Sequence, residues 1–385
     1  MRTLITAGAI LTPLERIPAA AVLIEDGRIA RIGPRSEFEI PEQTFDFPEA
    51  ILAPGLIDIH IHGAAGYDSM HLGDTGAAEM GRFLARHGVT SYCPTTVTAS
   101  DGETFRALES LGKTVNAPPR GALDTPCAVP LGLHLEGPFI SQARRGVHPP
   151  RHIQDASLAK LQRYIEASGQ TVRVITVAPE IPGALEMIRA TSARGIVCSI
   201  GHTNGDYEHA EAAIEAGARH ATHTFNAMRP VEHRNPGVAG AVLTDDRVFA
   251  DMIVDGLHVL PPIVDLFLRC KGKERAVLIS DAISATGMPP GRYRLGEFEV
   301  EVDGLRCDCH GKLAGSVLTL DKAVQNVMAF AGWSLQEAVR IATLNPARLL
   351  GLEKKGQIVA GADADLVVLK QSGEVIRTFI GGQGI

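Results

Sequence analysis

Eight short apolar runs in the middle of the chain are the feature that most limits how this sequence can fold. Segments with helical patterns separate the runs, and this alternation is typical of parallel βαβ units. The runs cover residues 55–62, 89–93, 129–136, 172–178, 195–200, 218–223, 248–254 and 276–281. Eight strand–helix alternations over about 230 residues favour a closed (β/α)8 barrel of the TIM type over an open sheet.

The two ends of the chain have a different pattern. Both are rich in short strand-like segments bounded by turn residues, such as Asp26-Gly27. We therefore predict an α/β protein in which residues 1–53 and 346–385 form one small β-sandwich domain. The barrel would occupy residues 54–345, with a hairpin insertion near 291–312 and two further helices around 319–331 and 334–344.

Composition narrows the class of protein. The 385 residues are 45% hydrophobic, which is enough for a large core, and the net charge of −7 argues against nucleic acid or an anionic membrane as a partner. No apolar stretch approaches the ~18 residues of a membrane span, and the first residues do not resemble a secretory signal. The 6 cysteines are scattered rather than arranged as a disulfide framework. A cytoplasmic protein with reduced thiols is expected.

Polar residues gather where the predicted strands end. The active site of such a barrel lies at the carboxyl ends of its strands, and residues two apart on a strand share a face. Imidazoles and carboxylates at five strand ends predict a site for a transition metal, although each histidine alone is compatible with a core or loop role. The residues are His60, His62, His134, Glu136, His202, His223 and Asp281. Among them, His134 is the first candidate for a packing role.

The chemistry of such a site is hydrolytic. A bound metal lowers the pKa of water to about 7 and polarises a carbonyl group. Amide hydrolysis also needs a group that takes a proton from the water and delivers it to the leaving nitrogen, and Asp281 is the candidate. The alternative for Asp281 is a cap on a following helix.

Several motifs resemble one enzyme family. PGLIDIHIHG at 54–63 is similar to the first-strand signature of the amidohydrolase superfamily. Further motifs, which follow one another in order along the chain, resemble the N-acetylglucosamine-6-phosphate deacetylases more specifically. The motifs that carry this likeness are HLEGPF at 134–139, GHTNG at 201–205, THTFNAM at 222–228, DGLHV at 255–259, SDAISATG at 280–287 and LAGSVLTLDKAV at 313–324.

The resemblance implies roles for individual residues. Glu136, His202 and His223 would be the principal metal ligands, Asp281 the acid/base, and His148 a group that polarises the substrate carbonyl. His60 and His62 would allow a second ion, with Glu136 bridging because the fourth run ends without a lysine. The implied sugar-phosphate contacts are Val147, Asn226, Ala227, Arg234, His258, Leu313, Ala314 and Gly315.

The resemblance also implies a reaction, a cofactor and an assembly. The enzyme would convert N-acetylglucosamine 6-phosphate into glucosamine 6-phosphate and acetate. It would use one or two divalent ions, with zinc expected first and iron, cobalt or manganese as alternatives, and would act as a homodimer. Arg229, His233 and Arg234 form a basic segment in an acidic protein, which independently suits a phosphorylated substrate.

Two other functions remain open at the level of sequence. A barrel with the same metal site could hydrolyse another amide, as dihydroorotases and hydantoinases do, although the basic segment and the missing lysine argue against it. A non-catalytic scaffold relative would not need the complete ligand set. Cys307-Asp308-Cys309-His310 invites a zinc interpretation, but no second ligand pair accompanies it.

Overall fold

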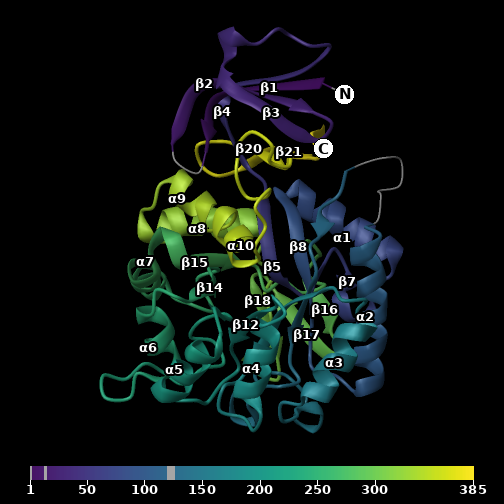
Figure 1. Ribbon diagram of the computed structural model, residues 1–385, viewed down its shortest axis with the longest axis vertical. Coiled ribbons are helices and arrows are strands. Elements are labelled where there is room, and N and C mark those ends of the chain that lie inside the picture. Colours follow the sequence, from purple (N-terminus) through teal and green to yellow (C-terminus); the bar gives the residue numbers. More distant parts are fainter. Residues whose placement is uncertain (1, 13–14, 119–125) are drawn as a thin grey trace.

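The computed structural model of the protein describes residues 2–12, 15–118 and 126–385. Eight parallel strands pair in chain order, which confirms the predicted barrel (Figure 1). They are β5 (Leu56–Ile61), β8 (Val89–Thr96), β10 (Leu133–Glu136), β11 (Val172–Val177), β12 (Val197–Ile200), β13 (His220–Ala221), β14 (Phe249–Ile253) and β15 (Ala276–Ile279). A parallel bridge between Ile61 and Ala282 joins the last strand to the first.

Helices cover the outside of the barrel, so its strands are buried on both faces. All eight residues of β8 are buried, for example, as expected for a parallel sheet covered by helices. The helices are α1 (Asp74–Arg86), α2 (Asp101–Asn116), α3 (Leu158–Ala167), α4 (Ala184–Ser192), α5 (Tyr207–Ala216), α6 (Gly237–Thr244), α7 (Pro261–Arg275), α8 (Leu320–Ala331), α9 (Leu335–Arg340) and α10 (Leu344–Leu349). No helix among the described residues is long and apolar enough to cross a membrane.

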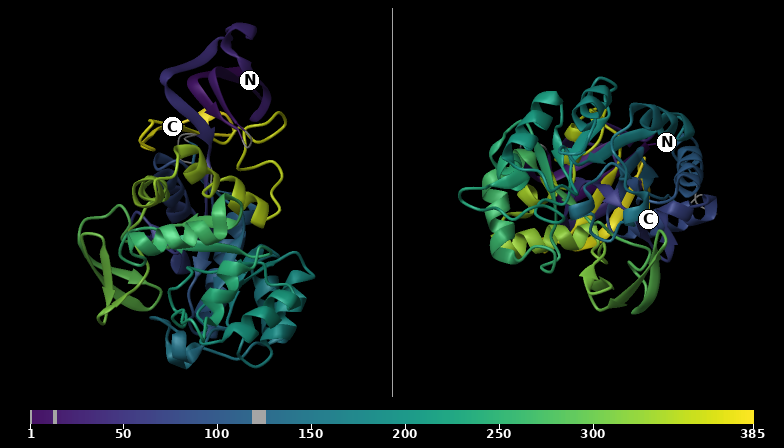
Figure 2. Two further views of the ribbon diagram at one scale, coloured as in Figure 1. Left: turned by 90° about the vertical axis from the view of Figure 1, so that its left-hand side faces the viewer. Right: turned by 90° about the horizontal axis from the view of Figure 1, so that it is seen from below.

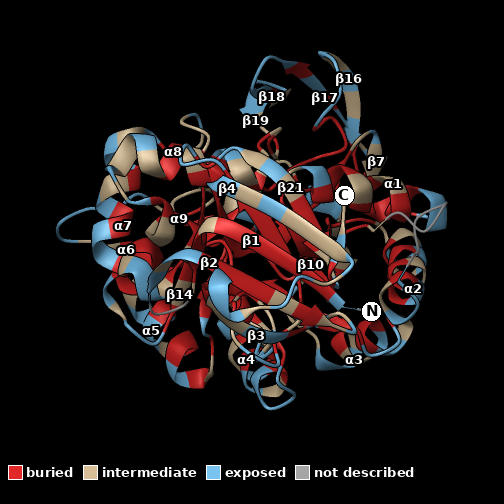
Figure 3. Ribbon diagram, turned by 90° about the horizontal axis from the view of Figure 1, so that it is seen from above, coloured by how far each residue is buried: buried red, intermediate tan, exposed pale blue. Residues whose placement is uncertain are grey.

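Both chain ends contribute to one seven-stranded sheet in the order β22-β21-β20-β4-β1-β2-β3. Its strands are β1 (Arg2–Leu11), β2 (Arg16–Glu25), β3 (Arg28–Pro34), β4 (Gln43–Pro54), β20 (Leu366–Leu369), β21 (Val375–Ile380) and β22 (Gln383–Gly384). Buried residues run along most of β1 (Figure 3). Asp26 and Gly27, with φ of 48° and 76°, form the two-residue turn between β2 and β3.

The terminal sheet leads directly into the first barrel strand. Gly55, between β4 and β5, donates its N–H to the carbonyl oxygen of Asp365 at 2.9 Å. The amino end of β5 therefore lies against the terminal sheet, and the carboxyl ends of the barrel strands open on the opposite side (Figure 1). This arrangement leaves the catalytic end of the barrel free of the terminal sheet.

The insertion is larger than the predicted hairpin. Four antiparallel strands follow one another: β16 (Gly291–Leu295), β17 (Phe298–Asp303), β18 (Arg306–Cys309) and β19 (Lys312–Leu313). The small sheet stands out from the side of the barrel (Figure 2). Its apolar side packs against Val97, Ala107 and Ile283 of the barrel. Two short strands, β6 (Gly63–Ala64) and β7 (Tyr67–Asp68), and the pair β9 (Val129–Pro130) with β8 complete the sheets.

Candidate metal centre and active site

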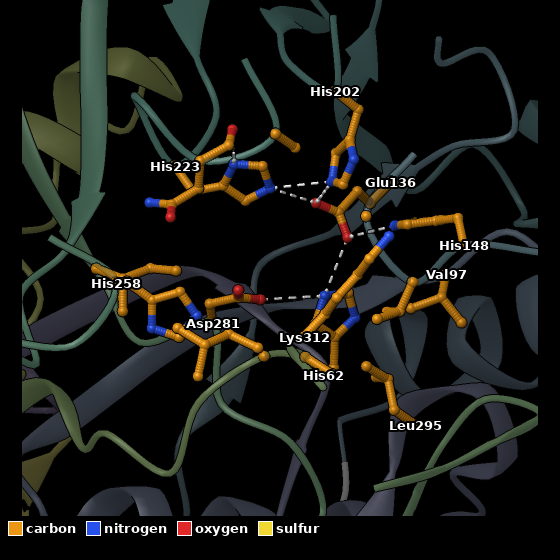
Figure 4. A pocket seen from close by; sticks show the side chains of 18 of the residues that line it. His62, Val97, Glu136, His148, His202, His223, His258, Asp281, Leu295 and Lys312 are labelled. Atoms are coloured by element: carbon orange, nitrogen blue, oxygen red, sulfur yellow. Dashed lines mark hydrogen bonds and ion pairs between the residues drawn. The ribbon is translucent and has the colours of Figure 1, made fainter. Parts of the chain in front are cut away.

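A cavity of about 210 Å³ opens at the carboxyl ends of the barrel strands (Figure 4). Most of the residues singled out in the sequence line it, and they come from many separate strand ends and loops. These lining residues are His62, Glu136, Val147, His148, His202, His223, Asn226, Ala227, His258, Asp281, Leu313, Ala314 and Gly315. Of the fifteen residues to which the resemblance assigns roles, the structure thus brings together thirteen; His60 and Arg234 are the exceptions.

Glu136, His202 and His223 form the first cluster. Oε1 of Glu136 lies 3.2 Å from Nε2 of His202 and 3.0 Å from Nε2 of His223, and the two nitrogens are 3.1 Å apart. The other ring nitrogens fix the tautomers. Nδ1 of His202 faces the carbonyl oxygen of Arg144 at 3.0 Å, and Nδ1 of His223 faces that of Asn226 at 3.2 Å. A carbonyl only accepts, so each Nδ1 carries a proton.

This tautomer leaves unshared electron pairs on both Nε2 atoms of the neutral rings. The two pairs and a carboxylate oxygen then point at one another, which is unfavourable unless a cation lies between them. Burial lowers the pKa of His202 to about 4, so this ring is neutral. Burial also acts against protonation of His223, but Glu136 raises the pKa of His223 to about 9. Without a metal, a proton therefore supplies the positive charge that the cluster requires.

His60, His62 and Asp281 form a second cluster beside the first. Nε2 of His62 lies 3.2 Å from Oδ1 of Asp281 and 3.2 Å from Nε2 of His60. Nδ1 of His62 faces the carbonyl oxygen of Thr95 at 3.2 Å, which again turns an unshared pair of Nε2 toward the centre. His60 is fully buried beneath the cavity, which is why it does not line it.

Glu136 lies between the two clusters. Oε1 faces His202 and His223, while Oε2 is 3.1 Å from Nε2 of His62. Burial by itself would raise the pKa of the Glu136 carboxyl, but the surrounding histidines hold it well below its usual value. The carboxylate is therefore ionised, with one oxygen available to each cluster. Together the residues form a site for a divalent metal ion.

His148 differs from the other histidines of the pocket. The backbone N–H of Thr98 donates to Nδ1 of His148 at 3.2 Å, so Nδ1 carries the unshared pair in the neutral ring. The proton is then on Nε2, which lies 3.5 Å from Oε2 of Glu136. A ring held in this tautomer donates a hydrogen bond into the pocket and is not suited to bind a metal through Nε2.

Backbone strain marks the same strand ends. His202, His223 and Asp281 have φ of 46°, 29° and 50°, a conformation that residues other than glycine seldom adopt. Such residues are concentrated at functional sites, where the surrounding structure holds them in place. Asp251 of β14 helps to do so, since its carboxylate accepts the backbone N–H of His223 and its carbonyl accepts that of Thr224. Asp281 is followed by a bridge at Ala282 and not by a helix, so it does not cap one.

His134 lies outside the cavity. It is fully buried, and its Nε2 is 2.8 Å from Oγ1 of Thr176 inside the barrel. Cys307 and Cys309 are buried in the apolar side of the insertion sheet, and neither belongs to a group of metal-ligating side chains among the described residues. Asp308, between them, accepts the backbone N–H of Gly311 at 2.7 Å.

Arg234 is the one expected substrate contact that lies away from the cavity of its own chain. It sits on the exposed segment between β13 and α6, where Nη1 is 2.6 Å from Nε2 of His233. His258, in contrast, lines the cavity and is held by Asp255, whose Oδ2 is 2.7 Å from Nδ1 of the ring.

The structure also reveals lining residues that sequence reasoning missed. They are Val97, Gly146, Ile253, Leu295, Phe298 and Lys312. Lys312 is exposed, and its ammonium group lines the cavity without a hydrogen-bond or ion-pair partner in the described part of the chain. The position of Lys312 directly before the Leu313-Ala314-Gly315 segment could have indicated from the sequence that it lines the cavity. The apolar residues gave no signal, since they resemble any core position.

Comparison with known proteins agrees with this geometry. Residues 51–385 match the amidohydrolase family. The chain is 41% identical to N-acetylglucosamine-6-phosphate deacetylase of Homo sapiens, covering 90% of this chain and 86% of the relative. It is 38% identical to N-acetylgalactosamine-6-phosphate deacetylase of Escherichia coli O157:H7, covering 94% and 93%.

Solved structures agree as well. The N-acetyl-D-glucosamine-6-phosphate deacetylase of Mycobacterium smegmatis superposes with a TM-score of 0.92 at 36% identity, with all of both chains covered. The N-acetylglucosamine-6-phosphate deacetylase of Thermotoga maritima superposes with a TM-score of 0.88 at 32% identity, with 99% of both chains covered. The chain therefore belongs to the amidohydrolase family, among the N-acetylglucosamine-6-phosphate deacetylases.

Proposed function

We propose that this protein hydrolyses the N-acetyl group of N-acetylglucosamine 6-phosphate, giving glucosamine 6-phosphate and acetate. The observation that carries the proposal is the convergence of Glu136, His202 and His223 with Asp281 and His148 around one cavity. The first three offer a metal site, the fourth an ionised carboxylate, and the fifth an N–H donor. These are the parts that amide hydrolysis by water requires.

Each protein group has a distinct task in this proposal. A divalent metal held by Glu136, His202 and His223 would polarise the amide carbonyl and make water more acidic. Nε2–H of His148 would donate a hydrogen bond to the carbonyl oxygen. Asp281 would take a proton from the attacking water and deliver it to the nitrogen as the C–N bond breaks. Burial opposes ionisation of Asp281, but His60 and His62 keep its pKa below the usual value, so it begins as a base.

We further propose zinc as the first ion, with iron, cobalt or manganese as alternatives of the same ligand preference. His60 and His62 would hold a second ion next to Asp281, with Glu136 as the bridge. The excess of negative charge at this second position supports the proposal. Burial acts against protonation of His62, yet Asp281 and Glu136 raise its pKa to about 10.

The substrate proposal is tested by acetate release from the purified, metal-loaded protein. N-Acetylglucosamine 6-phosphate should be turned over faster than N-acetylglucosamine, and metal analysis should find one or two ions per chain. N-Acetylgalactosamine 6-phosphate is the second candidate substrate, because the Escherichia coli relative is named for it. Turnover of a hydantoin or dihydroorotate, with no acetate from either sugar phosphate, would instead favour the cyclic-amide alternative.

We also propose that the protein acts as a homodimer. Four exposed apolar side chains, Leu257, Leu260, Ile263 and Leu266, follow one another at three-residue spacing around the start of α7. Several exposed apolar side chains within one short segment are typical of an association surface. The position of Arg234 outside its own cavity supports an arrangement in which it enters the cavity of the partner subunit.

Arg234→Ala tests the phosphate contact. Loss of a charged hydrogen bond costs roughly 1.5–3 kcal/mol, or about 10- to 100-fold in kcat/KM. We expect this loss on the phosphorylated sugar and little change on N-acetylglucosamine, which lacks the partner group. Arg234→Lys should recover only part of the lost kcat/KM on the phosphorylated sugar, because an ammonium group cannot form the two parallel hydrogen bonds of a guanidinium group. Equal losses on both sugars would contradict the phosphate role.

Mixed dimers locate the contact. Arg234→Ala and Asp281→Asn subunits, each weakly active alone, should regain activity when they are combined. One site of the hybrid would then have an intact Asp281 together with an intact Arg234 from the partner. Absence of rescue in demonstrated hybrid dimers would place Arg234 at the site of its own subunit.

A further inference from the structure

The cavity has two chemically different sides. His223 and His258 lie on one side, while Val97 and Leu295 lie on the other, next to His148, His62 and Lys312 (Figure 4). Phe298 also lines the cavity and packs on the same apolar cluster as Val97 and Leu295. Glu136 and Asp281 lie between the two sides, where the amide bond would be cleaved.

The apolar side is held in place by close packing of the insertion sheet on the barrel. Val97, just beyond β8, and Leu295, at the end of β16, are only 5% and 3% exposed. Gly296 follows with φ of 57°, and a Cβ there would lie 2.6 Å from a methyl carbon of Val97. Its N–H donates to Oδ2 of Asp68 at 2.7 Å, which anchors the turn. The wall is therefore preformed.

The proposed reaction orients the substrate between the two sides. An amide carbon has three substituents: its oxygen would face Nε2–H of His148, and its nitrogen would face Asp281. The sugar, attached to the nitrogen, then lies toward His258. The third substituent is the alkyl part of the acyl group, and the space left for it is bounded by the apolar wall.

We infer that Val97, Leu295 and Phe298 form the acyl-binding surface and determine which N-acyl groups the enzyme accepts. This inference rests on the proposed function. The surface offers no hydrogen-bond donor or acceptor from its three side chains, so it suits short aliphatic acyl groups. Leu295 limits their length because its side chain is only 3% exposed and the turn at Gly296 anchors the neighbouring backbone. The substrate class is thus the short-chain N-acyl amino sugar phosphates, with the acyl length set by these residues.

The test compares kcat/KM for N-acetyl-, N-propionyl- and N-butyrylglucosamine 6-phosphate. One methylene in an apolar pocket changes specificity by about 10- to 200-fold. Leu295→Ala should therefore lower kcat/KM for the acetyl substrate and raise the butyryl-to-acetyl ratio by about 10-fold or more. Leu305→Ala is the matched control, since Leu305 is 62% exposed at the turn between β17 and β18 of the same sheet. The butyryl-to-acetyl ratio of kcat/KM for Leu305→Ala should equal that of the wild type.

Val97→Ala is an independent variant on the barrel side of the apolar surface. If Leu295→Ala does not fold, the butyryl-to-acetyl ratio of kcat/KM for Val97→Ala tests the inference instead. If both variants slow all three substrates by the same factor, these side chains contact the sugar and the inference is wrong. If the wild type releases acetate normally but neither Leu295→Ala nor Val97→Ala changes the butyryl-to-acetyl ratio of kcat/KM, only the acyl-binding inference is wrong and the proposed function stands. A wild type that releases no acid from any of the three overturns the proposed function as well.

Discussion

Replacing His202 or His223 by alanine is expected to abolish both metal binding at the principal site and nearly all deacetylase activity. Each ring places an unshared pair next to Oε1 of Glu136, and the two nitrogens are only 3.1 Å apart. Removing one ring leaves too few ligands to hold a divalent ion tightly. A catalytic metal supplies several kcal/mol, so we expect a loss of about 10³-fold or more in kcat.

Metal content and kcat should fall together in these variants. His71→Ala, a change at an exposed histidine outside the site, should alter neither. The double variant at His60 and His62 should lose only the second ion and should have a smaller effect on kcat. Normal metal content and turnover in the His202 variant would show that the principal site lies elsewhere.

Asp281→Asn is expected to keep the metal and the fold but to turn over substrate about 10²- to 10⁴-fold more slowly. The amide is nearly isosteric with the carboxylate, yet it cannot accept a proton from water or return one to the leaving nitrogen. The loss should appear in kcat, while binding of the substrate changes less. Asp303→Asn, on an exposed strand residue of the insertion sheet, is the matched control.

The pH dependence of Asp281→Asn separates this role from a structural one. In the wild type, activity should fall in acid as a group with a lowered pKa takes up a proton, since burial is outweighed by His60 and His62. The variant should lack this acid limb. Near-normal kcat across the pH range would transfer the proton-transfer role to another group, with His148 as the next candidate.

Much of the architecture could be predicted because it depends on local pattern. The eight apolar runs correspond to the eight barrel strands, and the carboxyl ends of parallel strands must meet at one end of a barrel. The convergence of Glu136, His202, His223 and Asp281 follows from that rule. The insertion was only partly predictable, since β18 and β19 are short and carry little periodicity of their own.

Other features depend on contacts between distant segments. The tautomer of His148 is set by the N–H of Thr98, fifty positions away in the chain. The acyl-binding surface joins Val97 to Leu295 across nearly two hundred positions, and neither residue differs in type from an ordinary core residue. Arg234 carries the expected chemistry but lies outside the cavity of its own chain.

The sequence by itself determined the class of fold, the end of the barrel that carries the site and most of the imidazoles and carboxylates that meet there. These properties follow from hydrophobic periodicity and from the rule that alternate strand residues share a face. Only the tertiary structure decided which ring nitrogens carry protons and how the two carboxylate oxygens of Glu136 are divided between the two clusters. It also decided that Val97, Leu295 and Phe298 lie together at one side of the cavity. Those properties depend on the direction of single atoms, which packing and hydrogen bonds between remote segments impose.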